Sequence, residues 1–330
     1  MGVFKSKNHF PVEGRTILVT GGSQGMGKGI AQLLAGKGAN VLIVARNVQK
    51  LESALEDIRK SARDPSTQRF YFISADLSNP RSAASAIDQA TTWNNGSPPD
   101  SVICCAGAAH LGFFVDLDPA VFEEQMGTNY FSAAYTAHAV ARAWLAHPPT
   151  PKKSPMALEP RHIVFTSSLV AFLPFTGYTA YTTAKCALRA LSETLSQEFL
   201  LYEDHSPMRS HCVFPGTIFG AGLDTENALK PEITKQLEEG DDGKTPEQVA
   251  AATIKNLESG DELITVSGLL GKAMKSGSLG GSKRSGYGII DWMMSWATTV
   301  ILAFVRREMD GKVRAWGKRK NMGKIKDDNM

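Results

Sequence analysis

The sequence has 330 residues, 42% of them hydrophobic and 21% charged, which is enough for one large globular domain with an appendage or for two domains. A formal net charge of +3 is too small to indicate a nucleic-acid-binding protein. Residues 1–10 are polar and basic and lack the apolar stretch of a secretory signal. The cysteines have no metal-ligand spacing and are expected to be reduced thiols in a cytosol-facing protein: Cys104, Cys105, Cys186 and Cys212.

A glycine-rich turn follows the first predicted strand. Residues 16–19 are apolar or β-branched, Thr20–Gly27 contains four glycines, and residues 28–36 have helical character. Strand, glycine turn and helix in this order predict a dinucleotide site, because glycines let the backbone approach a pyrophosphate at the helix N-terminus. The residues expected to hold the cofactor here are Gly21, Ser23, Gln24, Gly25 and Gly27.

The second predicted strand, residues 39–45, ends at a cation. Folds selective for NAD usually carry an acidic residue at this place, where it accepts from the ribose 2′-hydroxyl. Here Arg46 occupies it, with Lys50 one helical turn later. Both suit a 2′-phosphate, so NADPH is the expected cofactor. The alternative is that Arg46 only ends a strand at the surface.

Further strands and helices alternate along the chain. Strands are predicted at 69–75, 100–105, 162–166, 211–214 and 263–266, with helices at 47–63, 79–93, 119–146 and 180–202. This pattern predicts an α/β fold: a Rossmann-type, doubly wound, seven-stranded parallel sheet with helices on both faces, spanning residues 15–268 after an extension at 1–14. Residues 217–245 are expected to form a substrate lid with one helix near 231–239.

Polar or small residues follow several of these strands. Asp76–Leu77 follows the third, Ala106–Gly107 the fourth and Pro215–Gly216 the sixth. Asp76 could accept from an adenine amino group, or it could cap the helix that begins near Asn79. Small residues at 106–107 would let the ribose and nicotinamide approach the backbone.

A tyrosine and a lysine four residues apart share one face of a predicted helix. Tyr181 and Lys185 would lie one turn from each other. In a partly dry site the lysine cation is expected to lower the pKa of the phenol, so that Tyr181 can exchange a proton in catalysis. The alternative is a solvated surface pair. Asn129 falls in the middle of the helix at 119–146, where a polar side chain usually faces water.

Together these motifs resemble the short-chain dehydrogenase/reductase family. The matching residues are Thr20–Gly27, Asp76, Ala106–Gly107, Asn129, Ser168, Tyr181, Lys185 and Pro215–Gly216. The resemblance implies that Tyr181 is the general acid, Ser168 holds the substrate carbonyl oxygen, and Lys185 holds the nicotinamide ribose. It implies that Asn129 anchors a water of a proton relay. Ser167 is adjacent to Ser168 and could share the substrate contact.

Within the family, several segments are similar to the fungal branch that acts on a long-chain sphingoid ketone: Lys5–Pro11, Thr20–Gly27, Val44–Asn47 and the hydrophobic tail. That resemblance implies NADPH-dependent reduction of 3-oxosphinganine to sphinganine at the endoplasmic reticulum membrane, with the catalytic domain facing the cytosol. A steroid or retinoid carbonyl reductase with the same residues, and a non-catalytic NADP-binding membrane scaffold, are the alternatives.

The C-terminal region predicts a membrane attachment. Residues 269–288 resemble a flexible linker, 289–305 are mostly apolar, and 306–330 form a basic tail. Seventeen residues are at the short limit for spanning a bilayer, so an interfacial helix or hairpin is favoured over a span. A helix that packs a soluble dimer is the alternative, and a homo-oligomer is expected.

Overall fold

The computed structural model describes residues 7–148, 159–174, 176–238 and 242–268, with isolated positions between 271 and 319. The expected linker at 269–288 and membrane segment at 289–305 fall largely outside the described residues. Within the described part of the chain, no helix has the length and apolarity needed to cross a membrane.

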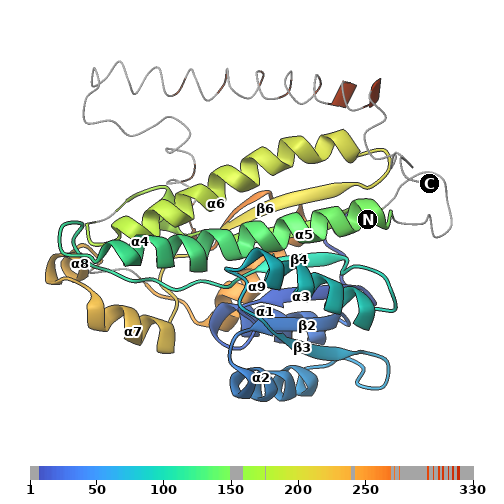
Figure 1. Ribbon diagram of the computed structural model, residues 1–330, viewed down its shortest axis with the longest axis horizontal. Helices are drawn as coiled ribbons and strands as arrows, with labels where there is room; N and C mark the ends of the chain where they lie inside the picture. The colour runs from blue at the N-terminus through green and yellow to red at the C-terminus, as the bar shows by residue number, and fades with distance from the viewer. Residues whose placement is uncertain are drawn as a thin grey trace, which may run out of the picture.

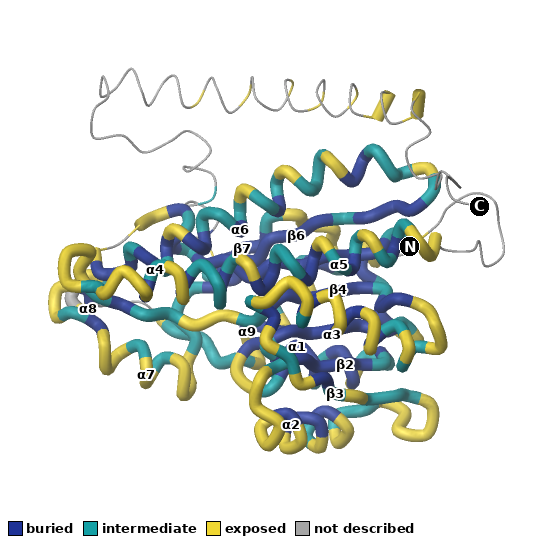
Figure 2. The backbone as a smooth tube through the Cα atoms, viewed as in Figure 1, coloured by how far each residue is buried: buried dark blue, intermediate teal, exposed yellow. Residues whose placement is uncertain are grey.

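Seven parallel strands form one sheet, as the sequence predicts, in the order β3-β2-β1-β4-β5-β6-β7. Their bounds are β1 Thr16–Thr20, β2 Asn40–Ala45, β3 Phe70–Ser74, β4 Ser101–Cys104, β5 Arg161–Thr166, β6 Met208–Phe214 and β7 Leu263–Thr265. Strands β1, β4 and β5 are buried along their whole length. In Figure 2 the buried backbone is concentrated in the sheet, between the helices. Burial on both faces explains their almost unbroken apolar runs. The strand order reverses between β1 and β4, which is where doubly wound sheets bind ligands.

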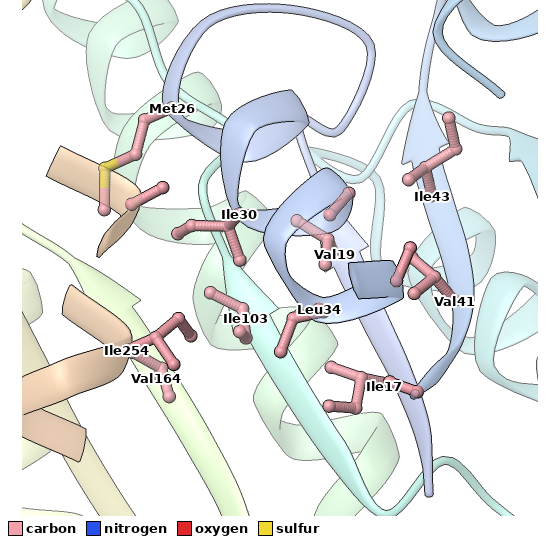
Figure 3. Close-up of a cluster of buried hydrophobic side chains, with 14 of the residues drawn as sticks. Ile17, Val19, Met26, Ile30, Leu34, Val41, Ile43, Ile103, Val164 and Ile254 are labelled. Carbon is pink, nitrogen blue, oxygen red and sulfur yellow. The ribbon is translucent and has the colours of Figure 1, made fainter. Parts of the chain in front are cut away.

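Helices cover both faces of the sheet (Figure 1). One face packs against α1 Gly25–Gly36, α2 Val48–Lys60 and α9 Pro246–Ser259. The other packs against α3 Pro80–Trp93, α5 Ser132–Ala146 and α6 Thr179–Glu198. Figure 3 shows the first of these cores, in which Ile30 and Leu34 of α1 meet Val19 of β1. Both cores lie under the strand ends that carry the expected site.

The helix predicted at 119–146 is interrupted. It consists of α4 Pro119–Gln125, a π-helical turn Met126–Phe131 and α5. The side chain of Asn129 donates to the backbone oxygen of Gln125 at 3.0 Å. In a regular α-helix that oxygen would instead accept from the backbone N–H of residue 129. The insertion turns Asn129 inward, so its side chain is fully buried. It therefore does not face water, although a polar side chain in the middle of a helix usually does. Such π-turns frequently occur at functional sites.

The expected lid contains two helices where the sequence predicted one. These are α7 Ala221–Leu229 and α8 Glu232–Leu237, which lie at one end of the molecule in Figure 1. Pro231 separates them: it restricts the preceding residue to extended backbone, and Lys230 has ψ 122°. Two short 3-10 helices, Leu169–Ala171 and Phe199–Tyr202, flank α6.

The described part of the expected N-terminal extension packs on the sheet domain. Phe10 is 1% exposed, and its ring meets His162 of β5 edge-on with the centroids 4.9 Å apart. The backbone N–H of His9 donates to the carbonyl oxygen of Glu258 at 2.9 Å. Residues 9 and 10 are therefore part of the domain and not a detached arm.

Replacing Phe10 by Ala should destabilise the fold by about 3–5 kcal/mol, because it removes a fully buried aromatic side chain and leaves a cavity. Urea unfolding measures this difference. Phe114→Ala is the matched control, since Phe114 is 64% exposed and its loss should cost about 1 kcal/mol or less. Equal losses in the two variants would contradict the burial of the N-terminal segment.

Candidate active site

The glycine turn connects the end of β1 to the start of α1 and packs against the backbone that follows β4. Gly21 has φ +65°, and a Cβ on it would lie 2.7 Å from the backbone nitrogen of Ala106. A Cβ on Gly27 would meet the carbonyl oxygen of Gly21 at still closer range. Side chains at these two positions would therefore push the turn away from β4 and from the helix. The first turn of α1 carries no acidic residue, so its free N–H groups suit a phosphate.

The cations expected to select the cofactor lie beside this turn. Arg46 is exposed directly after β2, and the Lys50 ammonium donates to Oε1 of Gln24 at 3.0 Å. That hydrogen bond ties the start of α2 to the glycine turn. The side chain of Asn47 caps α2 by accepting from the backbone N–H of Lys50. Arg46, which precedes this cap, is an exposed cation close to the glycine turn. Ser23 is half-buried in the same turn.

Asp76 is not a helix cap. Its carboxylate accepts from the backbone and hydroxyl of Ser78, at 3.0 and 2.7 Å, whereas Asn79 caps α3. Hydrogen bonds from Ser78, followed by the nearby charge of Arg46, hold the pKa of Asp76 below its usual value. The exposed carboxylate therefore stays ionised at the carboxyl end of the sheet. Leu77 points into the core, so only its backbone is available to a cofactor.

Lys185 is the buried centre of the site. Its side chain lies in α6, is only 3% exposed, and donates through Nζ to the carbonyl oxygen of Thr166 at 2.9 Å. A Cβ on Gly107 would lie 3.2 Å from this Nζ and 2.7 Å from Oδ1 of Asn129. Gly107 therefore lets the loop after β4 pass between the two side chains.

Asn129 holds that same loop. Its Oδ1 accepts from the backbone nitrogen of Ala108 at 3.2 Å, and its Nδ2 donates to the carbonyl oxygen of Ala108 at 2.9 Å. The π-turn thus fixes the backbone that follows Ala106–Gly107. The loop after β4, the π-turn and α6 meet at one point.

The two neighbouring serines have different surroundings. The hydroxyl of Ser167 donates to the carbonyl oxygen of Lys185 at 2.7 Å, which ties β5 to α6. The hydroxyl of Ser168 hydrogen-bonds Tyr181 and lies 3.5 Å from the carbonyl oxygen of Pro215. Of the two, Ser168 therefore lies beside the phenol, a distinction that the sequence left open. Pro215–Gly216 follows β6 beside it.

The ionisation of Tyr181 differs from the sequence expectation. Burial and the charge of Glu226 raise the pKa of this phenol, and the hydrogen bond from Ser168 lowers it only in part. Lys185 lies 5.3 Å from the centre of the Tyr181 ring but is itself desolvated, and burial lowers the pKa of its ammonium to about 8. The expected lowering of the tyrosine pKa by Lys185 is thus wrong for the protein alone. Tyr181 remains a protonated acid at neutral pH.

The lid brings a charged group to the site that the sequence analysis did not identify. Tyr178 lies one turn before Tyr181, with the ring centroids 6.0 Å apart. Its hydroxyl is within hydrogen-bonding distance of the carboxyl groups of both Glu226 and Glu238, and its single proton can go to one of them. Lys230 bridges the same two carboxylates at 3.0 and 2.6 Å. The spacing of Glu226 and Lys230 signals a helical ion pair, but α7 was not predicted.

Comparison with known proteins covers nearly the whole chain. Residues 15–228 match the family model described as short chain dehydrogenase. A 3-ketodihydrosphingosine reductase of Aspergillus fumigatus is 45% identical over 94% of this chain and 86% of its own length. One from Neurospora crassa is 44% identical over 97% and 87%, respectively. Among solved structures, the L-sorbose reductase of Gluconobacter frateurii with NADPH and L-sorbose has the same fold (TM-score 0.63, 18% identity, 78% of this chain and 96% of that one).

The affinity for the dinucleotide should fall as the pH rises through about 8, because Lys185 then loses the proton that makes it a cation. Fluorescence titration from about pH 6 to about pH 10 measures the dissociation constant. Lys185→Met should bind weakly throughout and lack this step. Lys37→Met, which changes the lysine that follows α1 and pairs with Glu258, should keep the wild-type profile. A step that persists in Lys185→Met would contradict the assignment.

Proposed function

Because this chain belongs to the short-chain dehydrogenase family, we propose that it reduces 3-ketodihydrosphingosine, also called 3-oxosphinganine, to sphinganine with NADPH. The observation that carries the proposal is the identity of 44–45% to two fungal reductases of this ketone along nearly the entire chain. The site supplies the acid and the hydrogen-bond donor that reduction of a ketone needs.

In this proposal the phenol of Tyr181 gives its proton to the carbonyl oxygen. NADPH, when bound, supplies the hydride that forms the new C–H bond at the carbonyl carbon. Negative charge then develops on the oxygen, where Ser168 donates a hydrogen bond and Tyr181 transfers a proton. A phenol with a raised pKa is fully protonated at neutral pH, which suits reduction. Asn129 holds the loop that carries Gly107, and Lys185 lies beside this loop where it could contact the ribose.

Arg46 supports the choice of NADPH over NADH. An exposed guanidinium at the end of β2 suits a phosphate on the ribose 2′-oxygen, because it offers several fixed donors. Lys50, held by Gln24, adds a second positive charge at the same edge. The backbone at Leu77, Ala106 and Pro215–Gly216 remains the expected contact of the adenine and nicotinamide ends.

The loops around the site expose large apolar side chains, which suits a long-chain substrate. Gly112 donates to the carbonyl oxygen of Gly177 at 3.0 Å, so the loop that follows it begins beside Tyr178. The large exposed apolar residues of this loop, of the loop after β5 and of the lid include Phe113, Phe114, Val115, Leu173, Phe219, Leu229, Ile233 and Leu237. An aliphatic chain could lie along such a surface and bury it.

Membrane association belongs to the same proposal. Trp296, Val300 and Phe304 are exposed helical residues spaced by four, so they share one face. Such a face fits the interfacial segment expected at 289–305, with basic residues on its C-terminal side. The proposed location is the endoplasmic reticulum membrane with the catalytic domain in the cytosol. Homo-oligomerisation stays a prediction.

The purified full chain should oxidise NADPH on addition of 3-oxosphinganine. Tyr181→Phe should abolish the reaction, because it removes the hydroxyl group that donates the proton. Absorbance of NADPH and mass spectrometry of sphinganine measure the outcome. Tyr71→Phe, at an exposed tyrosine of β3, is the control. A panel of steroid and retinoid ketones tests the other family activity, and turnover of these without the sphingoid ketone would overturn the proposal.

Arg46→Asp should lower the ratio of kcat/KM for NADPH to that for NADH by roughly ten- to a hundredfold, because it replaces a phosphate partner by a repelling carboxylate. Steady-state kinetics with both cofactors give the ratio. Arg59→Asp makes the same charge change at an exposed residue near the far end of α2 and should leave the ratio at the wild-type value. An unchanged ratio in Arg46→Asp would remove this residue from cofactor selection.

A further inference from the structure

The lid places two carboxyl groups and only one ammonium in a cluster next to Tyr181. Two carboxylates, Glu226 and Glu238, share one ammonium, that of Lys230, and one phenol, that of Tyr178. Burial lowers the pKa of Lys230, but the hydrogen bonds that its ammonium donates to both carboxyl groups outweigh burial and leave the pKa raised. Lys230 therefore stays charged, and two carboxyl groups share this one ammonium.

The two carboxylates are not equivalent. Glu238 uses both oxygens within the group: Oε1 accepts from Tyr178 at 2.6 Å and Oε2 from Lys230 at 2.6 Å. Glu226 directs a single oxygen, Oε1, to both of these partners. Its Oε2 takes part in neither contact, and the Glu226 side chain is 21% exposed. Glu226 thus has an oxygen to offer to a further donor.

Glu226 also lies within electrostatic reach of the reacting centre. Its charge contributes to the raised pKa of Tyr181. The ring of Tyr178, to which Glu226 is bonded, lies beside the ring of Tyr181. A substrate whose carbonyl oxygen contacts Tyr181 and Ser168 would therefore hold its neighbouring atoms near this carboxylate.

The proposed substrate carries a cation at that place. 3-Oxosphinganine has a primary amine on the carbon next to the carbonyl, and the protonated amine is an ammonium. A partly buried carboxyl group that shares its ammonium with a second carboxyl group suits such a cation, because a charge-assisted hydrogen bond offsets the cost of removing the ammonium from water.

We propose that Glu226 binds the ammonium of the substrate and thereby selects 2-amino ketones over simple long-chain ketones. This inference rests on the proposed function, since it concerns the substrate of the same site. Glu238, Lys230 and Tyr178 hold Glu226 in position and close the lid on the start of α6. The aliphatic chain is not involved in this selection, because the amine and the chain lie on opposite sides of the carbonyl.

The test compares 3-oxosphinganine with its amine-free analogue, the 1-hydroxy-3-ketone of the same chain length. The ratio of kcat/KM for the two ketones is measured with NADPH in the wild-type chain, in Glu226→Gln and in Glu238→Gln. Both variants remove one carboxylate charge and keep the side-chain size. The ratio should fall by roughly ten- to a hundredfold in Glu226→Gln. In Glu238→Gln the cluster that holds Glu226 is weakened, but Glu226 keeps its own carboxyl group, so the ratio should fall clearly less than in Glu226→Gln.

A ratio unchanged in Glu226→Gln, or equal falls in both variants, would overturn the inference. A wild-type chain that reduces neither ketone would instead contradict the proposed function. Product inhibition provides a test that needs no variant: sphinganine should inhibit the wild-type chain more strongly than N-acetylsphinganine or the amine-free diol. Equal inhibition by all three would also overturn the role of Glu226. Affinity for NADPH, measured on each variant, verifies that the cofactor domain is folded.

Discussion

The burial of the Lys185 ammonium is the constraint on which the rest of the site depends. A buried amine must be hydrogen-bonded, and Nζ finds the carbonyl oxygen of Thr166 at the carboxyl end of β5. This fixes α6 against the sheet and places Tyr181 one turn earlier. It also requires a glycine at position 107 in the loop after β4, because a Cβ there would crowd both this ammonium and the side chain of Asn129. The π-turn, the glycine and the catalytic helix are thus parts of one arrangement.

The electrostatics of the site keep Tyr181 in the protonated form that reduction of a ketone requires. Burial and the Glu226 carboxylate keep Tyr181 protonated, while desolvation brings the pKa of Lys185 to about 8, where modest changes in its surroundings alter its charge. A cationic substrate that pairs with Glu226 would remove part of the field that holds the phenol proton. The substrate would then promote proton release from Tyr181 at the moment when the carbonyl oxygen needs it. Recognition and catalysis would share one carboxylate.

Local sequence pattern was sufficient for the strands, the glycine turn and the spacing of Tyr181 and Lys185, because each depends on residues close together in the chain. It was insufficient where distant residues decide. The inward turn of Asn129 depends on Ala108, and the separation of Ser167 from Ser168 depends on the backbone of α6. The pKa of Tyr181 depends on burial and on a glutamate 45 positions later in the chain. Helix α7 was missed because its sequence is largely polar, follows a glycine and has little apolar periodicity. The helix is stabilised instead by the contact between Glu226 and Tyr178, which lies 48 positions earlier in the chain.

Isotope transfer is the most direct test of the central claim, that this site reduces a long-chain amino ketone with hydride from NADPH and a proton from Tyr181. The full chain would be given NADPH deuterated at the transferable C4 position and unlabelled 3-oxosphinganine, and the sphinganine would be analysed by mass spectrometry and NMR. The account predicts one deuterium on C3, bonded to carbon, while the hydroxyl hydrogen comes from solvent. Sphinganine without deuterium at C3, or label that appears there only from heavy water, would contradict it.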